Sequence, residues 1–521
     1  MLSAAAGIFL ALVAVGAFLA LRFQPVARDY FISTLQKRYR SEVALGSLRI
    51  SLFPAVHATG DNLVLRLNGR HDAPPLVQIR RFTLDAGFVS FFRNPRHIGR
   101  LRLEGLQIHL PPRHNASAPE TSSQASQSGA SHLSAPTADP TDATTADFVL
   151  DEVITDGTTL EVTPADPAKN PLVFEIQRLN LHTVGIGQPM TFDAELSNPK
   201  PPGLIHCVGQ FGPWNTAHPV DTAISGQYTF RDADLSVFKG ISGTLSSDGR
   251  FTGQLGRMEV EGTTDTPDFA LTIGGHPVSL HTDFQATVDG TNGNTVLHPV
   301  RARLGHSEFD VTGSVDRSAA ERRKTISLHA RTTAARLEDF LRLSVKGPKP
   351  PMTGGIRFDT TVKVPPGDTQ VIERLELDGT FGLSGVKFTS NDVQGKIAGL
   401  SHRAHGDPTD HDPDVKADFQ GSFHLRNGQL GLPDLQFTLP GANVSLRGSY
   451  VLKSGAIDLE GTAKLEATVS QMTTGFKSKL LRPFDPLFRR DGAGTVLPIA
   501  IGGTRGEPSF RLDIGRVLRR D

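Results

Sequence analysis

The sequence is poor in cysteine, tryptophan and tyrosine. Cys207 is the only cysteine among 521 residues, so the chain has no internal disulfide and no zinc site built from cysteines. The chain holds 4 tyrosines and 1 tryptophan, although it holds 30 phenylalanines. Outer-membrane barrels place Tyr and Trp in girdles at both membrane interfaces, so this balance argues against that class.

The sequence also lacks an excess of charge and the common catalytic motifs. The 54 basic and 54 acidic residues cancel, so no overall positive field favours nucleic acid as a partner. A G-x-S-x-G elbow, a phosphate loop ending in GK[ST] and an H-E-x-x-H zinc helix are all absent. We therefore expect a protein that is not an enzyme, with no catalytic residues, no cofactor and no metal site.

Strict alternation of apolar and polar residues is the dominant pattern that is present. It is clearest in HPVSLHTDFQATVDG (276–290) and in AIDLEGTAKLEATV (456–469), and a period of two predicts strands with one apolar and one wetted face. Ser-Asp-Gly (247–249) and Thr-Pro-Asp (266–268) are interpreted as turns between consecutive antiparallel strands. The apolar side of the two clear strands carries Val278, Leu280, Phe284, Val288, Ile457, Leu459, Leu465 and Val469.

The chain begins with an apolar stretch, from Leu2 to Leu21, that has no charged residue and is long enough to cross a bilayer. We interpret it as a transmembrane anchor, and a cleaved signal peptide is the alternative. The basic residues that follow conflict with a periplasmic location of the bulk of the chain under the positive-inside rule. These residues are Arg22, Arg28, Lys37, Arg38 and Arg40.

Composition suggests five segments. Residues 1–24 form the anchor, and residues 25–112 hold a short amphipathic helix (Val26–Tyr39) followed by strands. Residues 113–146 are almost entirely small or polar and are predicted to be a disordered linker. Residues 147–350 and 351–521 return to strands, with one short helix around Leu337–Leu341. Two basic amphipathic pieces, around residues 476–490 and 514–520, either close the end of the sheet or lie on an anionic membrane.

The predicted strands outnumber the predicted helices so strongly that helices cannot cover the apolar face. That face must close on itself, curl into a trough, or meet an apolar ligand. Gly421, Gly448, Gly461 and Ala463 recur on the apolar side, where small residues are interpreted as leaving room for a ligand. The trough and the self-packed sheet both stay open at this point.

One cluster of side chains resembles a metal site. SHRAHGDPTDHDPD (401–414) contains His402, His405 and three aspartates at alternate positions. A calcium loop starting at Asp410 would need Gly at its sixth position and Glu at its twelfth, but Val415 and Gly421 stand there. A solvated turn rich in Asp and Pro is the preferred interpretation.

Several stretches together resemble the AsmA family of bacterial envelope proteins, which are related to bridge-like lipid-transfer proteins. They are the N-terminal apolar stretch followed by VALGSLRISLFPAVHATGDNLVLR (43–66), LRLEGLQIHLPP (101–112), VEGTTDTPDFAL (260–271), LHTDFQATVDGTNGNTVLHPVRA (280–302) and PLFRRDGAGTVLPIAIGGTRGEPSFRLDIGRVL (486–518). The resemblance implies an inner-membrane anchor and a periplasmic antiparallel sheet curled into an elongated groove, a β-taco. It also implies phospholipid acyl chains in that groove and a role in outer-membrane lipid homeostasis.

The expected protein is therefore mostly β, anchored in the inner membrane by a single helix, with most of its chain in the periplasm. The residues expected to line the groove are the eight apolar residues of 278–288 and 457–469 given above. Expected partners are phospholipid, the inner membrane and possible envelope proteins, but not nucleic acid. The alternative is an envelope scaffold with a self-packed β core that binds no lipid.

Overall fold

The computed structural model describes most of the chain between residues 41 and 512. The described ranges are 41–51, 56–67, 77–87, 96–110, 148–162, 172–185, 188–213, 219–272, 274–290, 293–317, 324–367, 369–408, 412–472, 485–488, 492–504 and 507–512, with a few single residues near 29–36, 74–75 and 482. The predicted anchor, the linker 113–146 and the segment 514–520 lie outside these ranges, as does most of the predicted helix Val26–Tyr39. No helix in the described ranges has the length and apolar character needed to cross a membrane.

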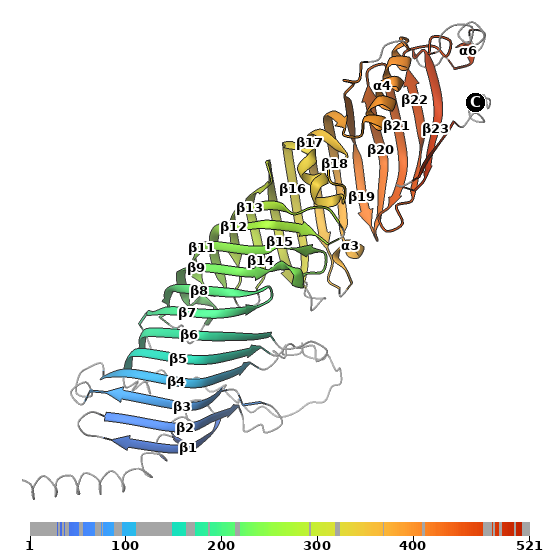
Figure 1. The fold of residues 1–521 in the computed structure, drawn as a ribbon. Coiled ribbons are helices and arrows are strands. Elements are labelled where there is room, and N and C mark those ends of the chain that lie inside the picture. The colour runs from blue at the N-terminus through green and yellow to red at the C-terminus, as the bar shows by residue number, and fades with distance from the viewer. Residues whose placement is uncertain are drawn as a thin grey trace, which may run out of the picture. The chain divides into compact units, whose positions relative to one another are not determined.

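Strands make up most of the described chain, and helices are few and short, so the prediction of a mostly β protein is confirmed (Figure 1). The chain divides into two compact units, which we call unit 1 (Met1–Tyr228) and unit 2 (Thr229–Asp521). The division falls within β9 (Ala223–Asp234). The predicted boundary at 350/351 falls inside unit 2.

Unit 1 is a sheet whose strands pair in the order in which they occur in the sequence. Its elements are β1 (Ser41–Ser51), β2 (Val56–Leu67), β3 (Val77–Ala86), β4 (Arg96–Leu110), β5 (Phe148–Val162), β6 (Leu172–Gly185), β7 (Met190–Pro199), β8 (Pro202–Phe211) and the short 3-10 helix η2 (Pro219–Asp221). All of these strand pairs are antiparallel except β4–β5, which is parallel.

The parallel β4–β5 pair corrects the prediction of an antiparallel sheet throughout. Antiparallel strands can be joined by a tight turn, whereas parallel neighbours need a connection of about a dozen residues or more. The connection here runs from Leu110 to Phe148, through the segment predicted to be a linker. A long connection permits either direction of pairing, so the sequence pattern of the strands alone did not decide it.

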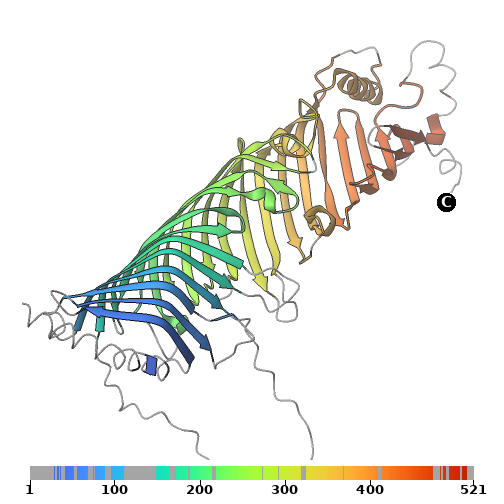
Figure 2. The same ribbon diagram turned by 60° about the horizontal axis from the view of Figure 1, so that its bottom comes forward.

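Six strands of unit 1 share one irregular row, which we call the crease row: Gly46, Asn62, Arg80, Gly105, Gly157 and Gln177. Asn62, Gly105 and Gly157 have φ of 54°, 62° and 66°, in the left-handed region that Gly and Asn tolerate best. From β1 to β6, the pairing keeps the same offset on both sides of the row. The strands of unit 1, shown in blue in Figure 2, bend part-way along their length.

The crease row also shifts the phase of the apolar pattern. On β3, Ile79 and Phe82 are both buried although they stand three residues apart, and on β5 Thr155 and Thr158 are buried with the same spacing. Without the extra residue, strict alternation would put one member of each pair on the opposite face. The crease row therefore keeps one face buried along the whole strand while the strand bends.

Unit 2 consists mainly of strands that pair antiparallel with their sequence neighbours, from β11 to β24. Its elements are η3 (Leu235–Val237), β10 (Ile241–Ser242), β11 (Thr244–Gln254), β12 (Arg257–Leu271), β13 (Val278–Val288), β14 (Thr295–Leu304), β15 (Ser307–Arg317), β16 (Lys324–Arg336), α2 (Leu337–Ser344), β17 (Met352–Val364), α3 (Val371–Arg374), β18 (Glu376–Phe388), α4 (Asn391–His405), β19 (Ala417–Arg426), β20 (Gln429–Leu439), β21 (Ala442–Val451), β22 (Ile457–Leu465), α6 (Asp485–Phe488), β23 (Thr495–Gly503) and β24 (Pro508–Leu512). Strand β10 pairs with β12, and β9 pairs with β11.

Every second strand from β12 to β20 carries one extra residue, and we call these positions the alternate bulges. They lie at Thr266–Phe269 in β12, Leu297–Val300 in β14, Thr332–Ala335 in β16, Leu383–Val386 in β18 and Leu432–Leu435 in β20. Strands β13, β15, β17, β19 and β21 take the regular side of these irregular pairs. A bulge bends its strand and increases the local twist, so this arrangement repeats in steps of two strands.

The interpretation of Thr-Pro-Asp and Ser-Asp-Gly as turns is wrong. Residues 266–268 lie inside β12, and residues 247–249 lie inside β11. Pro267 sits at the bulge of β12, where the extra residue has no partner and the missing N–H of proline costs little. Pro299 and Pro433 occupy the same kind of position in β14 and β20. Proline therefore marks bulges here and does not end the strands.

Candidate functional site

The candidate site is one face of the sheet of unit 2, which we call the apolar face; it carries Phe284 on β13 and Leu459 on β22. The register shows that these two strands, far apart in sequence, present the same side. A row of partners runs Thr264, Thr282, Ala302 and Phe309 across β12–β15, and then Thr332, Phe358, Phe381, Gly421, Leu435, Leu446, Gly461 and Ile499 across β16–β23. The rings of Phe309 and Phe358 lie 6.1 Å apart, which joins the two parts of the row.

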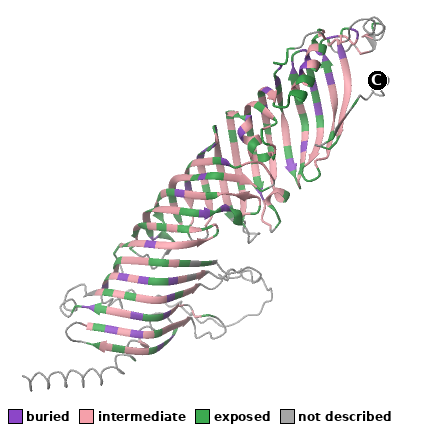
Figure 3. Cartoon of the chain, in the orientation of Figure 1, coloured by how far each residue is buried: buried purple, intermediate pink, exposed green. Residues whose placement is uncertain are grey.

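The middle of the apolar face is only half-buried. We call these residues the central strip: Leu280, Phe284, Phe309, Phe358, Phe381, Leu435 and Leu459, each of intermediate exposure. Figure 3 shows the strands of unit 2 mostly in the colours of intermediate and exposed residues, with few buried ones. A closed sandwich would bury such side chains almost completely. The chain therefore leaves part of its apolar surface uncovered in the described residues of unit 2.

Phenylalanine dominates the central strip and its surroundings. Phe340 of α2 lies with its ring 5.5 Å from that of Phe358 in an edge-to-face arrangement, and 6.0 Å from that of Phe309. Further along the sheet, the rings of Phe381 and Phe423 are 6.1 Å apart. Such pairs stabilise by about 0.5–1.5 kcal/mol beyond the area they bury. The paired rings of the strip therefore belong to two groups, Phe309 and Phe358 with Phe340, and Phe381 with Phe423.

Helix α2 covers one margin of the apolar face. Leu337 of α2 packs with Val386 and Ala417 in a buried cluster, and Leu341 and Met352 pack against it. The helix is held by Asp339, whose carboxylate accepts hydrogen bonds from the backbone N–H of His306 (3.0 Å) and the hydroxyl of Ser307 (2.7 Å). A buried carboxylate with two donors is a firm attachment, so α2 is a fixed cover.

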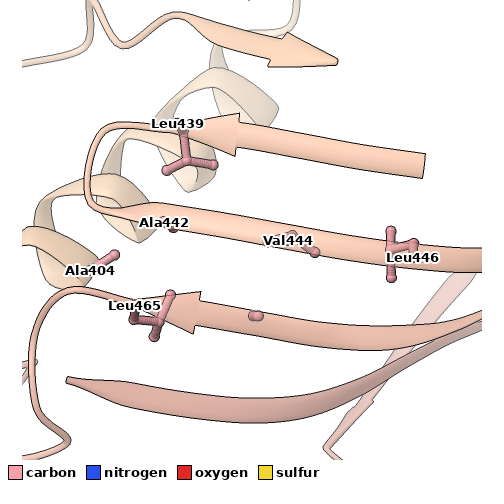
Figure 4. Close-up of a cluster of buried hydrophobic side chains, with 7 residues drawn as sticks. Ala404, Leu439, Ala442, Val444, Leu446 and Leu465 are labelled. Atoms are coloured by element: carbon pink, nitrogen blue, oxygen red, sulfur yellow. The ribbon is translucent and has the colours of Figure 1, made fainter. Parts of the chain in front are cut away.

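Helix α4 covers the same margin further along the chain. Its Ala404 packs into a cluster of β20–β22 side chains, shown in Figure 4. The cluster consists of Ala404, Leu439, Ala442, Val444, Leu446, Ala463 and Leu465. The hydroxyl of Ser401 donates to the Pro440 carbonyl at 2.7 Å, and the amide of Gln394 donates to the carbonyls of Pro413 (2.9 Å) and Val415 (2.7 Å). Both helices bury the margin, and Phe340 of α2 also contacts Phe309 and Phe358, but every residue of the central strip stays partly exposed.

The eight residues predicted to line a groove fall into three positions. Leu280, Phe284, Val288, Ile457 and Leu459 are half-buried on the apolar face. Val278 (7 % exposed) and Leu465 (3 % exposed) lie in the covered margin. Val469 is half-buried beyond the end of β22. The predicted residues of β13 and those of β22 lie on one face, but strands β14–β21 separate them.

The glycines on the apolar side do not leave spare room, which corrects that part of the sequence argument. A methyl group added at Gly461 would collide with the backbone carbonyl of Ser445, and one at Gly421 would collide with that of Asp434. These glycines are needed because neighbouring backbone approaches closely. The exposure of the central strip therefore comes from missing cover and not from small residues.

Sequence reasoning named Phe284 but missed the other aromatic residues of the central strip and the whole of α4. Phe309 and Phe358 lie in regular strands between bulged ones, and Phe381 lies in the bulged strand β18, so strict alternation does not extend from one strand to the next. The sequence did contain a signal, because Phe358 and Phe381 stand on the apolar side of the alternating stretches RFDTTV (357–362) and TFGL (380–383). Helix α4 starts with the N-cap Ser390, whose hydroxyl accepts from the Val393 N–H at 3.5 Å.

The His/Asp cluster is part of a helix end, so the interpretation of its first residues as a turn is wrong. His402 and His405 lie in the last turn of α4, which ends at Gly406 with φ of 94°. A ring nitrogen of His405 lies 2.9 Å from the Glu466 carboxylate, and one of His402 lies 2.8 Å from the Asp412 carbonyl. No group of three or more potential metal ligands occurs among the described residues.

Cys207 is unsuited to nucleophilic chemistry. It is a free cysteine on β8. Burial raises the pKa of its thiol to about 11, with a smaller contribution from the carboxylate of Asp193. A thiol with this pKa is protonated at neutral pH and is a poor nucleophile.

The apolar face of unit 1 is more completely covered near the crease row. Leu45, Ile79, Phe82 and Leu106 form a buried cluster, and Ile32 packs against it. The hydroxyls of Thr155 and Thr158 are buried and have no hydrogen-bond partner among the described residues. An unsatisfied buried hydroxyl costs about 1–3 kcal/mol, so these two atoms are a local source of instability.

Comparison with known protein families, with curated proteins and with solved structures finds no match.

Proposed function

We propose that the protein is an inner-membrane-anchored lipid-handling protein of the bacterial periplasm, and that the apolar face of unit 2 binds phospholipid acyl chains. The observation that carries the proposal is the half-buried central strip, whose residues stay partly exposed although α2 and α4 cover the adjoining margin and Phe340 of α2 contacts two of them. Contiguous apolar surface on a protein usually marks a site for an apolar ligand, a partner or a membrane.

The chemistry of the strip suits acyl chains better than a polar ligand. Its side chains are Phe and Leu, and its described neighbours on the same face are apolar, threonine or glycine. Burying a methylene of an acyl chain against such a surface contributes about 0.8 kcal/mol. A chain lying along successive strands would collect this contribution many times without any specific polar contact.

The resemblance of the sequence to the AsmA family supports the same function. It adds the N-terminal anchor, the periplasmic location and a role in phospholipid transport or outer-membrane homeostasis. A reporter fused after Asp521 tests the location, since a periplasmic reporter is expected. A cytoplasmic reporter would contradict the proposal and would agree with the basic residues that follow Leu21.

A photo-crosslinking experiment tests the lipid site directly. A photoreactive phenylalanine analogue placed at Phe284, in the central strip, is expected to capture phospholipid in cells. The same analogue at Gln285 is the matched control, because this adjacent residue of β13 is exposed on the opposite face. Equal labelling at both positions, or none at Phe284, would count against a lipid site on the apolar face.

The alternative, a scaffold that binds no lipid, is separated by a pair of substitutions. Leu465→Asp buries a charge in the covered margin and is expected to destabilise unit 2 by several kcal/mol. Phe284→Asp places the charge in the half-buried strip, so the fold is expected to survive with less bound phospholipid. Thermal unfolding and lipid extraction from the full-length protein in detergent measure both effects. If Phe284→Asp unfolds the protein as Leu465→Asp does, the strip is structural core.

A further inference from the structure

The face of unit 2 opposite the central strip contains an open hollow across β16–β20, with a volume of about 550 Å³ and both polar and apolar surface. Two rows of the register supply its polar lining, and Phe358, Phe381 and Gly421 of the row between them also line it. One row is Arg331, Asp359, Thr380, Ser422 and Asp434, and the next is Arg357, Gly382, Gln420 and Gln436. Both rows alternate along each strand with the row of Phe358 and Phe381, so their side chains lie on the other face. A hollow of this volume is within the range of small-molecule sites.

Two arginines in the hollow, Arg331 and Arg357, have no hydrogen-bond or ion-pair partner among the described residues. Some cross-strand arginines of unit 2 are paired, as Arg447 is with Glu460 at 2.8 Å. Arg331 stands opposite Asp310 and Asp359 in the register but forms an ion pair with neither. Arg357 likewise has no hydrogen-bond or ion-pair partner in the described part of the chain. Two guanidinium groups are therefore available to a ligand.

The structure makes specific room for the guanidinium of Arg357. Gly382 is its direct partner on β18, and a Cβ added at Gly382 would lie 2.5 Å from Nε of Arg357. Arg357 therefore lies flat over the glycine, on the floor of the hollow. Glycine inside a strand costs about 0.5–1 kcal/mol relative to alanine. Gly382 carries this cost at the position opposite Arg357, where a larger residue would displace the guanidinium group.

The acidic residues of the hollow are already engaged. Asp359 lies 2.7 Å from a ring nitrogen of His329, and Asp434 accepts hydrogen bonds from the hydroxyl and the backbone N–H of Ser422. The amide of Gln420 donates to the carbonyl oxygen of Gln436 at 2.7 Å, which leaves three lone pairs and three N–H bonds of the pair for other partners. The hollow thus offers cationic forks on the side of β16 and β17, and neutral or acidic groups on the side of β19 and β20.

We propose that this hollow binds a phosphate ester of a small polar molecule. The phosphate lies against the guanidinium groups of Arg357 and Arg331, since the planar fork of arginine matches phosphate oxygens bidentately. The hydroxyl or ammonium groups of the ligand lie toward the glutamine pair and Asp434. A free phosphate fills only a small part of 550 Å³, so an ester with a polar body fits the hollow better.

The test measures binding of glycerol 3-phosphate to the full-length protein in detergent by titration calorimetry. Arg357→Gln is expected to weaken binding roughly ten-fold or more, because it removes charge-assisted hydrogen bonds. Gly382→Ala keeps the charge but displaces the guanidinium, and a weakening comparable to that of Arg357→Gln is expected. Arg447→Gln is the matched control, because it makes the same substitution at a cross-strand arginine outside the hollow. This variant is expected to bind as the unmodified protein does.

A second arm distinguishes the source of the phosphate. Phosphatidylglycerol in nanodiscs competes with glycerol 3-phosphate if the ligand is a lipid headgroup, whereas phosphatidylcholine-only nanodiscs do not. Competition by inorganic phosphate alone, equal for all variants, would overturn the proposal, as would the absence of saturable binding of either probe. Crosslinking at Phe284, which does not line the hollow, is independent of Arg357, so failure here leaves the proposed lipid site on the other face untouched.

Discussion

Unit 1 and unit 2 differ in where their strands carry the extra residues that accompany bending. Both keep one apolar face along strands that bend, and both do so with extra residues. In unit 1 all strands from β1 to β6 place the irregular residue in one shared row, so the pairing offset stays constant from β1 to β6. In unit 2 only every second strand carries the extra residue, so the offset changes at each bulge. The irregularity is shared between neighbours in unit 1 and belongs to single strands in unit 2.

This comparison predicts the largest effect for single-residue deletions in unit 2. Deleting Gln285 from the regular strand β13 puts half of its apolar residues on the polar face, and a loss of roughly 4 kcal/mol or more is expected. Deleting Pro299 from the bulge of β14 leaves Leu297, Val300 and Ala302 in simple alternation on their present face, and restores a constant offset with β13. A loss of about 1 kcal/mol or less is expected there.

Urea unfolding of the full-length protein, followed by far-ultraviolet circular dichroism, measures both deletions. Gln285→Ala and Pro299→Ala serve as controls that keep the chain length, and each is expected to change stability only slightly. If the two deletions destabilise equally, the neighbouring strands depend on the extra residue in β14, which contradicts the view that this bulge concerns β14 alone.

A smaller effect is expected from a change in the crease row of unit 1. Gly157 has φ of 66°, and no heavy atom lies within 4 Å of a Cβ added there. Gly157→Val therefore tests backbone conformation alone, and a loss of about 2 kcal/mol is expected because a β-branched residue disfavours the left-handed region. Gly157→Asn is the control, since asparagine tolerates that region. Thermal unfolding that ranks Val and Asn together would show that the crease does not need its backbone conformation.

The smallest effect is expected from acid. Hydrogen bonds from the hydroxyl and the backbone N–H of Ser422 lower the pKa of Asp434 below its ordinary value of 3.8. A lowered pKa in the folded state adds stability that is present above pH 3.8 and is lost as the pH falls through the folded value. Ser422→Ala should therefore reduce stability slightly at pH 6 and leave it unchanged near pH 2. A difference that persists at pH 2 would point to lost packing and not to the carboxylate.

Much of the fold could be predicted from the sequence, because alternation in β13, β19, β21 and β22 runs without interruption. What could not be predicted was where alternation changes phase. A proline such as Pro267 or Pro299 can end a strand or mark a bulge. Only the pairing with the neighbouring strand decides between these two roles. The parallel β4–β5 pair was missed for a similar reason, since the pattern of a strand does not encode its direction.

The candidate site was predictable as a face but not as a set of residues. Phe284 and Leu459 were correctly assigned to one side, because period two fixes the side within each strand. Val278 and Leu465 are covered because helices α2 and α4 fold back over that margin, and a helix such as α4, with Gly395 and Gly399 inside it, has a weak helical signature. The hollow across β16–β20 depends on register between strands, which the sequence of any one strand does not contain.

The alternation of a regular and a bulged strand has a consequence for how such a sheet can change its length. Duplicating a pair such as β13–β14 would add a hairpin whose chain enters and leaves at the same end of the strands, and whose apolar side lies on the same face as that of its neighbours. Duplicating a single strand would reverse the direction of everything after it. Growth or shrinkage by pairs is therefore the route that conserves the oily surface, and related chains of different size are expected to differ by even numbers of strands.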